Sequence, residues 1–227
     1  MTSVWAVLAV ILAGAGYLLG LRRGRSAEAA LRTQIDERSE RVALLEHEVL
    51  RLSSLDLVTG LHSQEHFQQF LENEWRRASR ERQAVSVIMI ELDHFGAFLE
   101  GHGKPDGDAY LKSVAGVLKP LIHRPSDVLA NYGGPGKFGV VLGGTDNRGA
   151  MILADRLRLS VAGLKLRNPT ATTGNSLTAS VGVASAVPDR EAAWQDIELI
   201  AAAERALSRA KEAGRNVVSA DTTHLAK

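Results

Sequence analysis

Two histidines and a glutamate have the spacing that some zinc enzymes use to hold their metal. His62, Glu65 and His66 match the HxxEH pattern of zinc proteases. A helix would place the two histidines on one face, where both could contact the same ion. A catalytic zinc site needs three protein ligands, however, and nothing in the sequence suggests the third. We therefore expect no metal site at this position.

The charge balance and the lack of cysteine exclude other chemistries. The 227 residues include 27 basic and 26 acidic ones, which gives a net charge of +1. A balance so near neutrality argues against a protein that mainly coats nucleic acid, so no nucleic-acid partner is expected. With zero cysteines, there is no cysteine nucleophile, disulfide framework or thiolate-bound zinc. The length suits one ordinary globular domain with an appendage, or two small domains.

The start of the chain has the pattern of a membrane anchor. Val4 to Leu21 is uncharged and mostly apolar, and Arg22, Arg23 and Arg25 follow at once. At ~1.5 Å per residue, the apolar run just spans a hydrocarbon core of ~30 Å. A cleaved signal peptide is the alternative, but it would need basic residues before the run. We expect residues 1–25 to cross the bacterial inner membrane once, with the rest in the cytoplasm.

Residues 26–55 have the pattern of a coiled-coil linker helix. They contain no proline or glycine, and their apolar residues follow alternating steps of three and four. This seam comprises Leu31, Ile35, Val42, Leu45, Val49 and Leu52. An amphipathic helix lying on its own globular domain is the alternative, although the stripe is narrow and its flanks are charged. We expect a homodimer held by the coiled coil and the membrane helix.

From Asp56 on, helical and strand patterns alternate. Ala84 to Leu92 is nearly continuous in apolar residues, which is typical of a buried strand. Val128 to Tyr132 and Phe138 to Leu142 flank a glycine-rich turn and predict a hairpin. The whole pattern predicts an α/β domain over residues 56–219, with a mixed central sheet covered by helices, before a flexible tail at 220–227. Helices are expected over 64–80, 106–119, 145–164 and 196–213, and further strands over 177–184 and 216–219.

Six blocks of this region, in order, resemble the GGDEF domain of diguanylate cyclases. They match the family's DxLTGL entry, DIDHF strand end, GDAVL helix, RYGG hairpin, final long strand and closing ADxALYxAKxxGRN helix. The blocks are DLVTGL at 56–61, ELDHF at 91–95, GDAYL at 107–111, NYGG at 131–134, LTASVGVA at 177–184 and AAERALSRAKEAGRNV at 202–217. The resemblance implies a GGDEF-type fold and, in the family, an enzyme that joins two GTP molecules into cyclic di-GMP.

The sequence departs from that family at its catalytic site. The resemblance assigns Mg²⁺ to two carboxylates, and Glu91 stands at the first position. The family's turn is replaced by Gly133-Gly134-Pro-Gly-Lys137-Phe, which puts a lysine at the second position. An ammonium repels the dication that a carboxylate would attract. The asparagine that the family uses on guanine is replaced by Leu99, which cannot hydrogen-bond.

Other residues of the catalytic site keep the family's types. By the resemblance, Asp108 is the other guanine ligand, and Lys211 and Arg215 contact phosphate. We expect a degenerate site with no catalytic residues, so that the chain is not an enzyme, has no cofactor and has lost Mg²⁺. The alternative is a weak or altered cyclase in which Lys137 neutralises phosphate directly.

A second site of the family keeps its residues. Many cyclases carry an inhibitory RxxD site five residues before the turn, with a companion arginine in the next helix. Arg124-Pro-Ser-Asp127 has this spacing, and Arg156 is the companion. Arginine can donate twice to guanine O6 and N7, and a carboxylate can accept from guanine N1–H and N2–H. Alone, RxxD would indicate only a surface turn with a local ion pair; in this register it predicts cyclic di-GMP binding.

Together these features predict a membrane-anchored, catalytically silent GGDEF protein. It would act as a cyclic di-GMP receptor and pass the signal to an unidentified protein effector. One alternative is the weak cyclase described above. Another is a docking scaffold that binds no nucleotide.

Overall fold

The computed structural model describes residues 54–171, 174–188 and 196–221, together with Gln34, Arg38 and Arg41, which are helical. The chain divides into two compact units, Met1–Leu52 and Ser53–Lys227. The predicted anchor lies outside the described residues. So do most of the predicted linker helix and most of the predicted tail.

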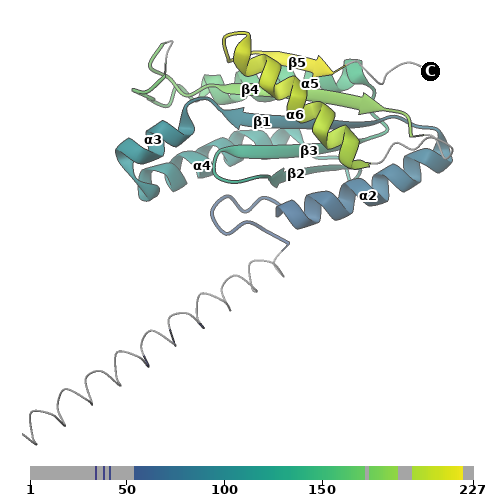
Figure 1. The fold of residues 1–227 in the computed structure, drawn as a ribbon, viewed down its shortest axis with the longest axis horizontal. Coiled ribbons are helices and arrows are strands. Elements are labelled where there is room, and N and C mark those ends of the chain that lie inside the picture. Colours follow the sequence, from purple (N-terminus) through teal and green to yellow (C-terminus); the bar gives the residue numbers. More distant parts are fainter. Residues whose placement is uncertain are drawn as a thin grey trace, which may run out of the picture. The chain divides into compact units, whose positions relative to one another are not determined.

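A five-stranded mixed sheet forms the centre of the second unit (Figure 1). Its strands lie in the order β2-β3-β1-β4-β5. The central strand β1 is antiparallel to both neighbours, whereas β5 is parallel to β4. The predicted mixed sheet is thus confirmed. The strands are β1 (Val85–Leu92), β2 (Asp127–Asn131), β3 (Lys137–Gly143), β4 (Ala179–Ala186) and β5 (Val218–Asp221).

Helices cover both faces of the sheet. One apolar cluster joins α2 and α6 to one face, and a second joins α3, α4 and α5 to the other. The helices are α2 (Gln64–Glu81), α3 (Phe95–His102), α4 (Lys104–Leu118), α5 (Asn147–Gly163) and α6 (Asp196–Glu212), with a 3₁₀ turn η1 (Lys119–Leu121) after α4. The sequence patterns did not predict α3, which lies between the strand expected to end at Leu92 and the helix expected from residue 106.

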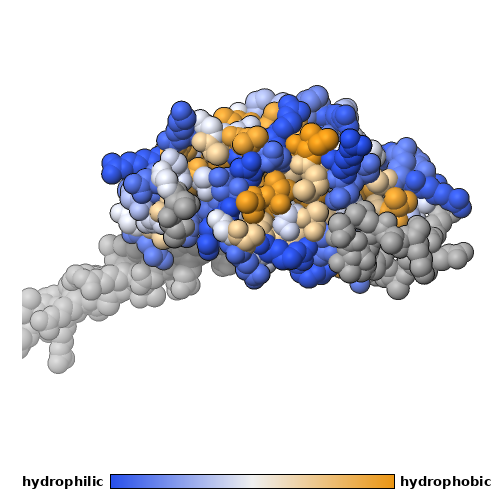
Figure 2. All heavy atoms as spheres, turned by 90° about the horizontal axis from the view of Figure 1, so that it is seen from above, coloured by the Kyte–Doolittle hydropathy of each residue, from blue (hydrophilic) through white to orange (hydrophobic). Residues whose placement is uncertain are grey.

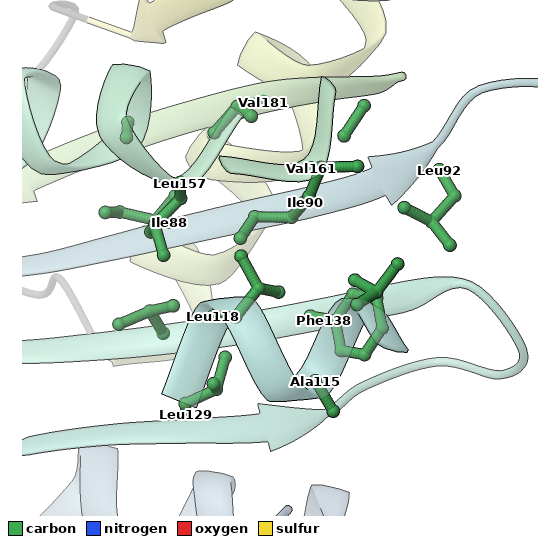
Figure 3. Packing of buried hydrophobic residues seen from close by; sticks show 14 of the residues in the cluster. Ile88, Ile90, Leu92, Ala115, Leu118, Leu129, Phe138, Leu157, Val161 and Val181 are labelled. Carbon is green, nitrogen blue, oxygen red and sulfur yellow. The ribbon is translucent and has the colours of Figure 1, made fainter. Parts of the chain in front are cut away.

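Strand β1 contributes side chains to both clusters. Val87 and Met89 pack on the side of α2 and α6. Ile88 and Ile90 pack on the opposite side, with Leu118 of α4 and Leu157 of α5, as Figure 3 shows. A strand that is buried on both faces has no polar face to present to water. This is why its sequence is nearly continuous in apolar residues.

One face of the domain carries several apolar groups at its surface. On the face shown in Figure 2, small apolar patches are separated by hydrophilic residues. Such scattered exposure is ordinary for a folded domain. The most exposed large apolar side chains of the described residues are Leu55, Leu57, Ile152, Leu159, Val187 and Ile197.

The predicted location in the bacterial inner membrane is contradicted. None of the helices in the described ranges has both the length and the apolar character that crossing a bilayer requires. Helix α2, for example, has 18 residues but carries Glu72, Glu74, Arg76 and Arg77 along its surface. The apolar run on which the prediction rested, Val4 to Leu21, lies outside those ranges.

Candidate functional site

Arg124, Asp127 and Arg156 line a single cavity of about 460 Å³. Asp127 is the first residue of β2, Arg124 lies in the turn before it, and Arg156 comes from α5. The fold therefore brings the companion arginine to the RxxD turn across a separation of about thirty residues in sequence, as the register of the motifs implied.

Backbone hydrogen bonds close the RxxD turn and attach it to the sheet. The amide of Asp127 donates to the carbonyl of Arg124 at 3.0 Å, and the amide of Gly143 on β3 donates to the carbonyl of Ser126 at 2.9 Å. Among the described residues, no ion pair of 4 Å or less joins Arg124 to Asp127. The turn is therefore not held by a local ion pair, and both charged groups remain available to a ligand.

The carboxyl of Asp127 is half-buried and has one side-chain partner. Ser126 Oγ donates to its Oδ1 at 3.2 Å. Burial raises the pKa of the Asp127 carboxyl above its usual value, and the hydrogen bond from Ser126 and the charge of Arg124 oppose that rise only in part. A ligand that donates N–H groups to this carboxylate would favour its ionised form.

One face of α5 forms a wall of the same cavity. Gly149, Ile152, Leu153 and Arg156 all line it, and the last three are three, four and seven residues after Gly149, on one face of the helix. Ile152 is 59% exposed, so it presents an apolar surface beside the arginines. The wall thus combines a surface that can pack against a flat ring with a cation that can pair with phosphate.

The turn between β2 and β3 places Lys137 beside Glu91. The two residues are opposite each other in the β1–β3 pairing, and Lys137 Nζ lies 3.4 Å from Glu91 Oε2. Lys211, from α6, donates to both Glu91 oxygens at 3.1 Å. The carboxylate is therefore shared by two ammonium groups from different elements; we refer to these three residues as the Glu91 cluster.

Close backbone approach determines the shape of this turn. Gly136 has a φ of +82°, and a Cβ there would lie 2.7 Å from the ring of Phe95. The amide of Lys137 donates to the carbonyl of Gly134 at 3.2 Å, and the amide of Leu92 donates to the carbonyl of Gly136 at 2.8 Å. Glycine at position 136 thus lets the turn lie against α3, with the Lys137 side chain directed to Glu91.

The residues present do not fit the Mg²⁺ ion that the family resemblance implies. Glu91 already has both oxygens bonded to ammonium groups. Asp93, two residues on, is 4% exposed and accepts hydrogen bonds from Thr178, Ser180 and the amide of Asn216. Within the described ranges, no group of three or more acidic, histidine or cysteine residues could hold a metal ion. This donor set suits an ammonium better than a hard dication.

Leu99 and Asp108 face a larger, mostly apolar cavity of about 500 Å³. The Leu99 side chain packs directly against Gly107. A Cβ added at position 107 would lie only 2.0 Å from Leu99 Cδ2. Gly134 and Pro135 of the turn also line this cavity. The structure thus places Leu99 and Asp108, the two positions that the resemblance relates to guanine, in one space, where Leu99 supplies apolar surface.

Two predicted positions lie outside these cavities. Arg215 follows the end of α6, with a φ of 64°, and its amide donates to the carbonyl of Ala210. Gly133 is hydrogen-bonded to α2, where its amide donates to Gln64 Oε1 at 3.1 Å. Neither residue lines the cavity of Arg124 or the apolar cavity of Leu99.

The HxxEH pattern does not form a metal site in the described part of the chain. His62 and His66 stack with their ring centroids 4.1 Å apart. Burial, together with the charge of His62, lowers the pKa of His66. Ser63 caps α2 by accepting from the amide of His66 at 3.3 Å. The pattern thus lies at the N-terminus of α2, with His62 before the helix and His66 within it.

Several residues of these cavities were not predicted from the sequence. Glu204 and Ser208 line the cavity beside the Glu91 cluster, together with Tyr132. The sequence did contain a pattern that could have found two of them. Glu204, Ser208 and Lys211 are spaced four and three residues apart on α6 and so share one face. Lys104 and Asn131, which line the apolar cavity, come from separate elements and had no such signal.

Residues 53–217 match the family model described as "Diguanylate cyclase, GGDEF domain". The "Probable diguanylate cyclase DgcT" of Escherichia coli K12 is 35% identical over 163 residues, which cover 72% of this chain and 34% of that protein. "Diguanylate cyclase A" of Treponema denticola is 29% identical over 189 residues, 82% of this chain and 49% of that protein. The chain thus spans a third to a half of the length of these relatives.

Solved structures have the same fold. The coiled coil and GGDEF domain of DgcB from Caulobacter crescentus, in complex with c-di-GMP, superposes with a TM-score of 0.65 at 24% identity, covering 86% of this chain and 99% of that one. SiaD from Pseudomonas aeruginosa, in complex with its activator SiaC, gives a TM-score of 0.61 at 22% identity, covering 94% and 84%. At these identities the likeness establishes the fold.

These comparisons contradict the prediction that the chain is not an enzyme, because the matched relatives are named diguanylate cyclases. The prediction depended on the charge change at Lys137. That change alone does not decide the matter, since a lysine can also neutralise a phosphate. Because the family model matches most of the chain, residues 53–217, the chain belongs to the GGDEF family of diguanylate cyclase-like domains.

Proposed function

We propose that this GGDEF protein is a receptor for cyclic di-GMP, which it binds in the cavity of Arg124, Asp127 and Arg156. The observation that carries the proposal is the convergence of these three residues on one cavity, with no ion pair of 4 Å or less between Arg124 and Asp127. The DgcB structure, which contains c-di-GMP, gives the same fold a precedent for this ligand.

The chemistry of the three side chains matches that of the ligand. The Arg124 guanidinium can donate to guanine O6 and N7 together, and the Asp127 carboxylate can accept from guanine N1–H and N2–H. Arg156 supplies positive charge for the phosphates. Ile152, on the same face of α5, offers an apolar surface for the base.

In this proposal, ligand binding produces a signal by changing how the domains of the protein are arranged. A homodimer held by the linker helix, and a protein effector that reads its arrangement, would carry the signal. A ligand shifts such an equilibrium only by binding one arrangement more tightly than the other.

Isothermal titration of the full chain with cyclic di-GMP tests the receptor. We expect saturable heat, and a loss of affinity of roughly 10- to 100-fold for Arg124→Ala and for Arg156→Ala, because each removes a charge-assisted contact. Arg148→Ala is the matched control, since Arg148 is exposed on the same helix and does not line the cavity. No heat, or equal binding by Arg124→Ala, would reject the proposal and favour a docking scaffold.

Diguanylate cyclase activity is a second candidate function. The names of the relatives favour it, and so does the gathering of Lys137 and Lys211 beside Glu91. Incubation of the full chain with GTP, in Mg²⁺, in Mn²⁺ and in EDTA, followed by chromatography for cyclic di-GMP, tests it. Product in any of these conditions that is lost in Lys211→Ala would support it, and no product in all three would reject it.

A further inference from the structure

We propose that the apolar cavity faced by Leu99 and Asp108, called the Leu99 cavity below, binds a small apolar molecule that carries a protonated amine. Its volume of about 500 Å³ lies within the range of ~300–1,000 Å³ that is usual for small-molecule sites. The proposal goes beyond cyclic di-GMP binding, because the Leu99 cavity shares no lining residue with the cavity of Arg124.

Apolar side chains from separate elements form the walls of the Leu99 cavity. Leu111 of α4 is buried in the core, and Leu99 of α3 and Val58 pack against that core. Pro135 adds an apolar ring from the turn between β2 and β3. A polar group that left water for these walls would lose hydrogen bonds that the apolar side chains cannot replace. The walls therefore favour a ligand with an apolar body.

The charged groups of the Leu99 cavity are mostly acidic. Asp56, Glu100 and Asp108 line it, and Lys104 is the one basic residue that does so. Within the part of the chain that the structure describes, no ion pair of 4 Å or less joins Lys104 to any of the three acids. The excess of negative charge attracts a cation and opposes a phosphate. The ligand therefore carries its positive charge on the same molecule as its apolar body.

The Asp56 carboxylate is held in place before any ligand arrives. Its Oδ1 accepts from the amide of Thr59 at 2.7 Å and from Thr59 Oγ1 at 2.6 Å. Burial opposes the ionisation of Asp56, but the hydrogen bonds from Thr59 and from Asn131 lower its pKa below the usual value. One carboxylate of the cavity is thus charged at neutral pH, and binding a cation does not require ordering it.

Equilibrium dialysis of the full chain with probes that share one ring system tests the proposal. The probes are 2-naphthylmethylamine, which is a cation, 2-naphthylmethanol, which is neutral, and 2-naphthylacetate, which is an anion. We expect affinity to fall in that order, with the amine bound roughly tenfold more tightly than the carboxylate, because only the charge differs. Equal affinities, tighter binding of the carboxylate, or no binding of any probe would overturn the proposal.

Glu100→Lys tests the charge of the cavity at a position that is exposed. We expect the preference for the amine over the carboxylate to fall about threefold or more, because one attraction becomes a repulsion. Glu212→Lys is the matched control, since Glu212 is exposed at the end of α6 and does not line the cavity. Equal changes in the two variants would mean that the net charge of the chain selects the amine, which would overturn the proposal.

Leu99→Asn tests the apolar wall. Asparagine removes apolar surface, so we expect the affinity for all three naphthyl probes to fall roughly tenfold, with thermal unfolding confirming that the variant is folded. Leu159→Asn makes the same change at an exposed leucine of α5 that lies outside the cavity, and it should bind as the parent does. Unchanged binding by Leu99→Asn would overturn the proposal.

Competition separates this proposal from cyclic di-GMP binding. Saturating cyclic di-GMP should leave the affinity for the amine unchanged, because the two cavities share no lining residue. Guanosine should bind more weakly than the amine, because its polar edge finds apolar walls. Displacement of the amine by cyclic di-GMP, or tighter binding of guanosine, would overturn the proposal. The titration of Arg124→Ala with cyclic di-GMP is independent of these results.

Discussion

The cavity lined by Arg124, Asp127 and Arg156, called the Arg124 cavity below, and the Glu91 cluster arrange their charges in opposite ways. In the first, Arg124 and Asp127 are three residues apart, yet they form no ion pair of 4 Å or less. In the second, Glu91 is paired with lysines from β3 and α6. Charged groups that line a cavity without a partner can be satisfied by a ligand, whereas paired charges must first be separated or be completed by an anion.

The two regions also differ in how they are held. The RxxD turn is fixed by backbone hydrogen bonds to β3. The Glu91 cluster depends on the position of α6, because Lys211 is on that helix. Changes that move α6 should therefore disturb the cluster and leave the Arg124 cavity intact, which none of the α6 residues line.

Gly182→Ala should have the largest effect and separate the two regions most clearly. A Cβ at Gly182 on β4 would lie 2.2 Å from the backbone of Ala203 and Leu207, so α6 must move away from the sheet. We expect a loss of about 2–3 kcal/mol in the free energy of unfolding, measured by urea denaturation. Cyclic di-GMP affinity, measured below the unfolding range, should be unchanged.

The control for that change is Gly116→Ala, on α4. A Cβ there meets nothing within 4 Å, and alanine favours a helix over glycine by about 0.5–1 kcal/mol. Its stability should therefore equal or exceed that of the parent. If Gly182→Ala were as stable as Gly116→Ala, the tight contact between β4 and α6 would not restrict this position.

Asp127→Asn tests the Asp127 carboxylate, which has no ion-pair partner within 4 Å in the Arg124 cavity. Asparagine offers one acceptor oxygen and no charge, so we expect cyclic di-GMP affinity to fall roughly 10- to 100-fold in isothermal titration. Asp155→Asn removes the same charge from a residue that pairs with Arg158 outside the cavity, and it should bind almost as the parent does. Similar losses in both variants would mean that net charge alone matters.

The pH dependence of binding should report the same carboxyl. Burial raises the pKa of Asp127, and only the ionised form accepts two N–H groups from guanine. Affinity should therefore fall as pH drops from about 7 to about 4, beginning above the usual range for aspartate, and Asp127→Asn should flatten the profile. A parent profile that matched the variant's would exclude Asp127 from the contact.

The same raised pKa has the opposite sign for stability. The folded chain holds this proton more tightly than the unfolded chain, so the contribution is full below the unfolded pKa and is lost as pH rises through the folded pKa. Ligand binding and folding therefore respond to Asp127 in opposite directions. Urea denaturation of the parent and of Asp127→Asn over the same pH range would reveal the difference.

The smallest effect should come from the ion pairs of the Glu91 cluster. Because their side chains are partly exposed to water, Glu91→Gln should change the free energy of unfolding by less than about 1 kcal/mol in urea. A loss several times larger would show that these ion pairs contribute strongly to the stability of the fold.

Much of the architecture followed from local patterns. The apolar run of β1, the hairpin around the glycines and the amphipathic helices α2, α5 and α6 could be predicted, because periodicity reports which faces are buried. Helix α3 was missed because it is short, has His94 as an N-cap that makes no side-chain capping bond, and closely follows a strand. The N-cap of α5 is Asp146, whose Oδ1 accepts from the amide of Gly149, so the helix begins at Asn147 and not at residue 145 as predicted.

The sequence was sufficient to predict that Arg124, Asp127 and Arg156 belong together, since motif order and spacing carry that information without coordinates, and the structure places the three at one cavity. The resemblance also implied that Lys137 stands where the family has a carboxylate. Only the tertiary structure showed that Lys137 and Lys211 share Glu91, because α6 brings Lys211 there across 120 residues. Contacts between distant elements depend on sheet register and helix packing, which no local pattern encodes.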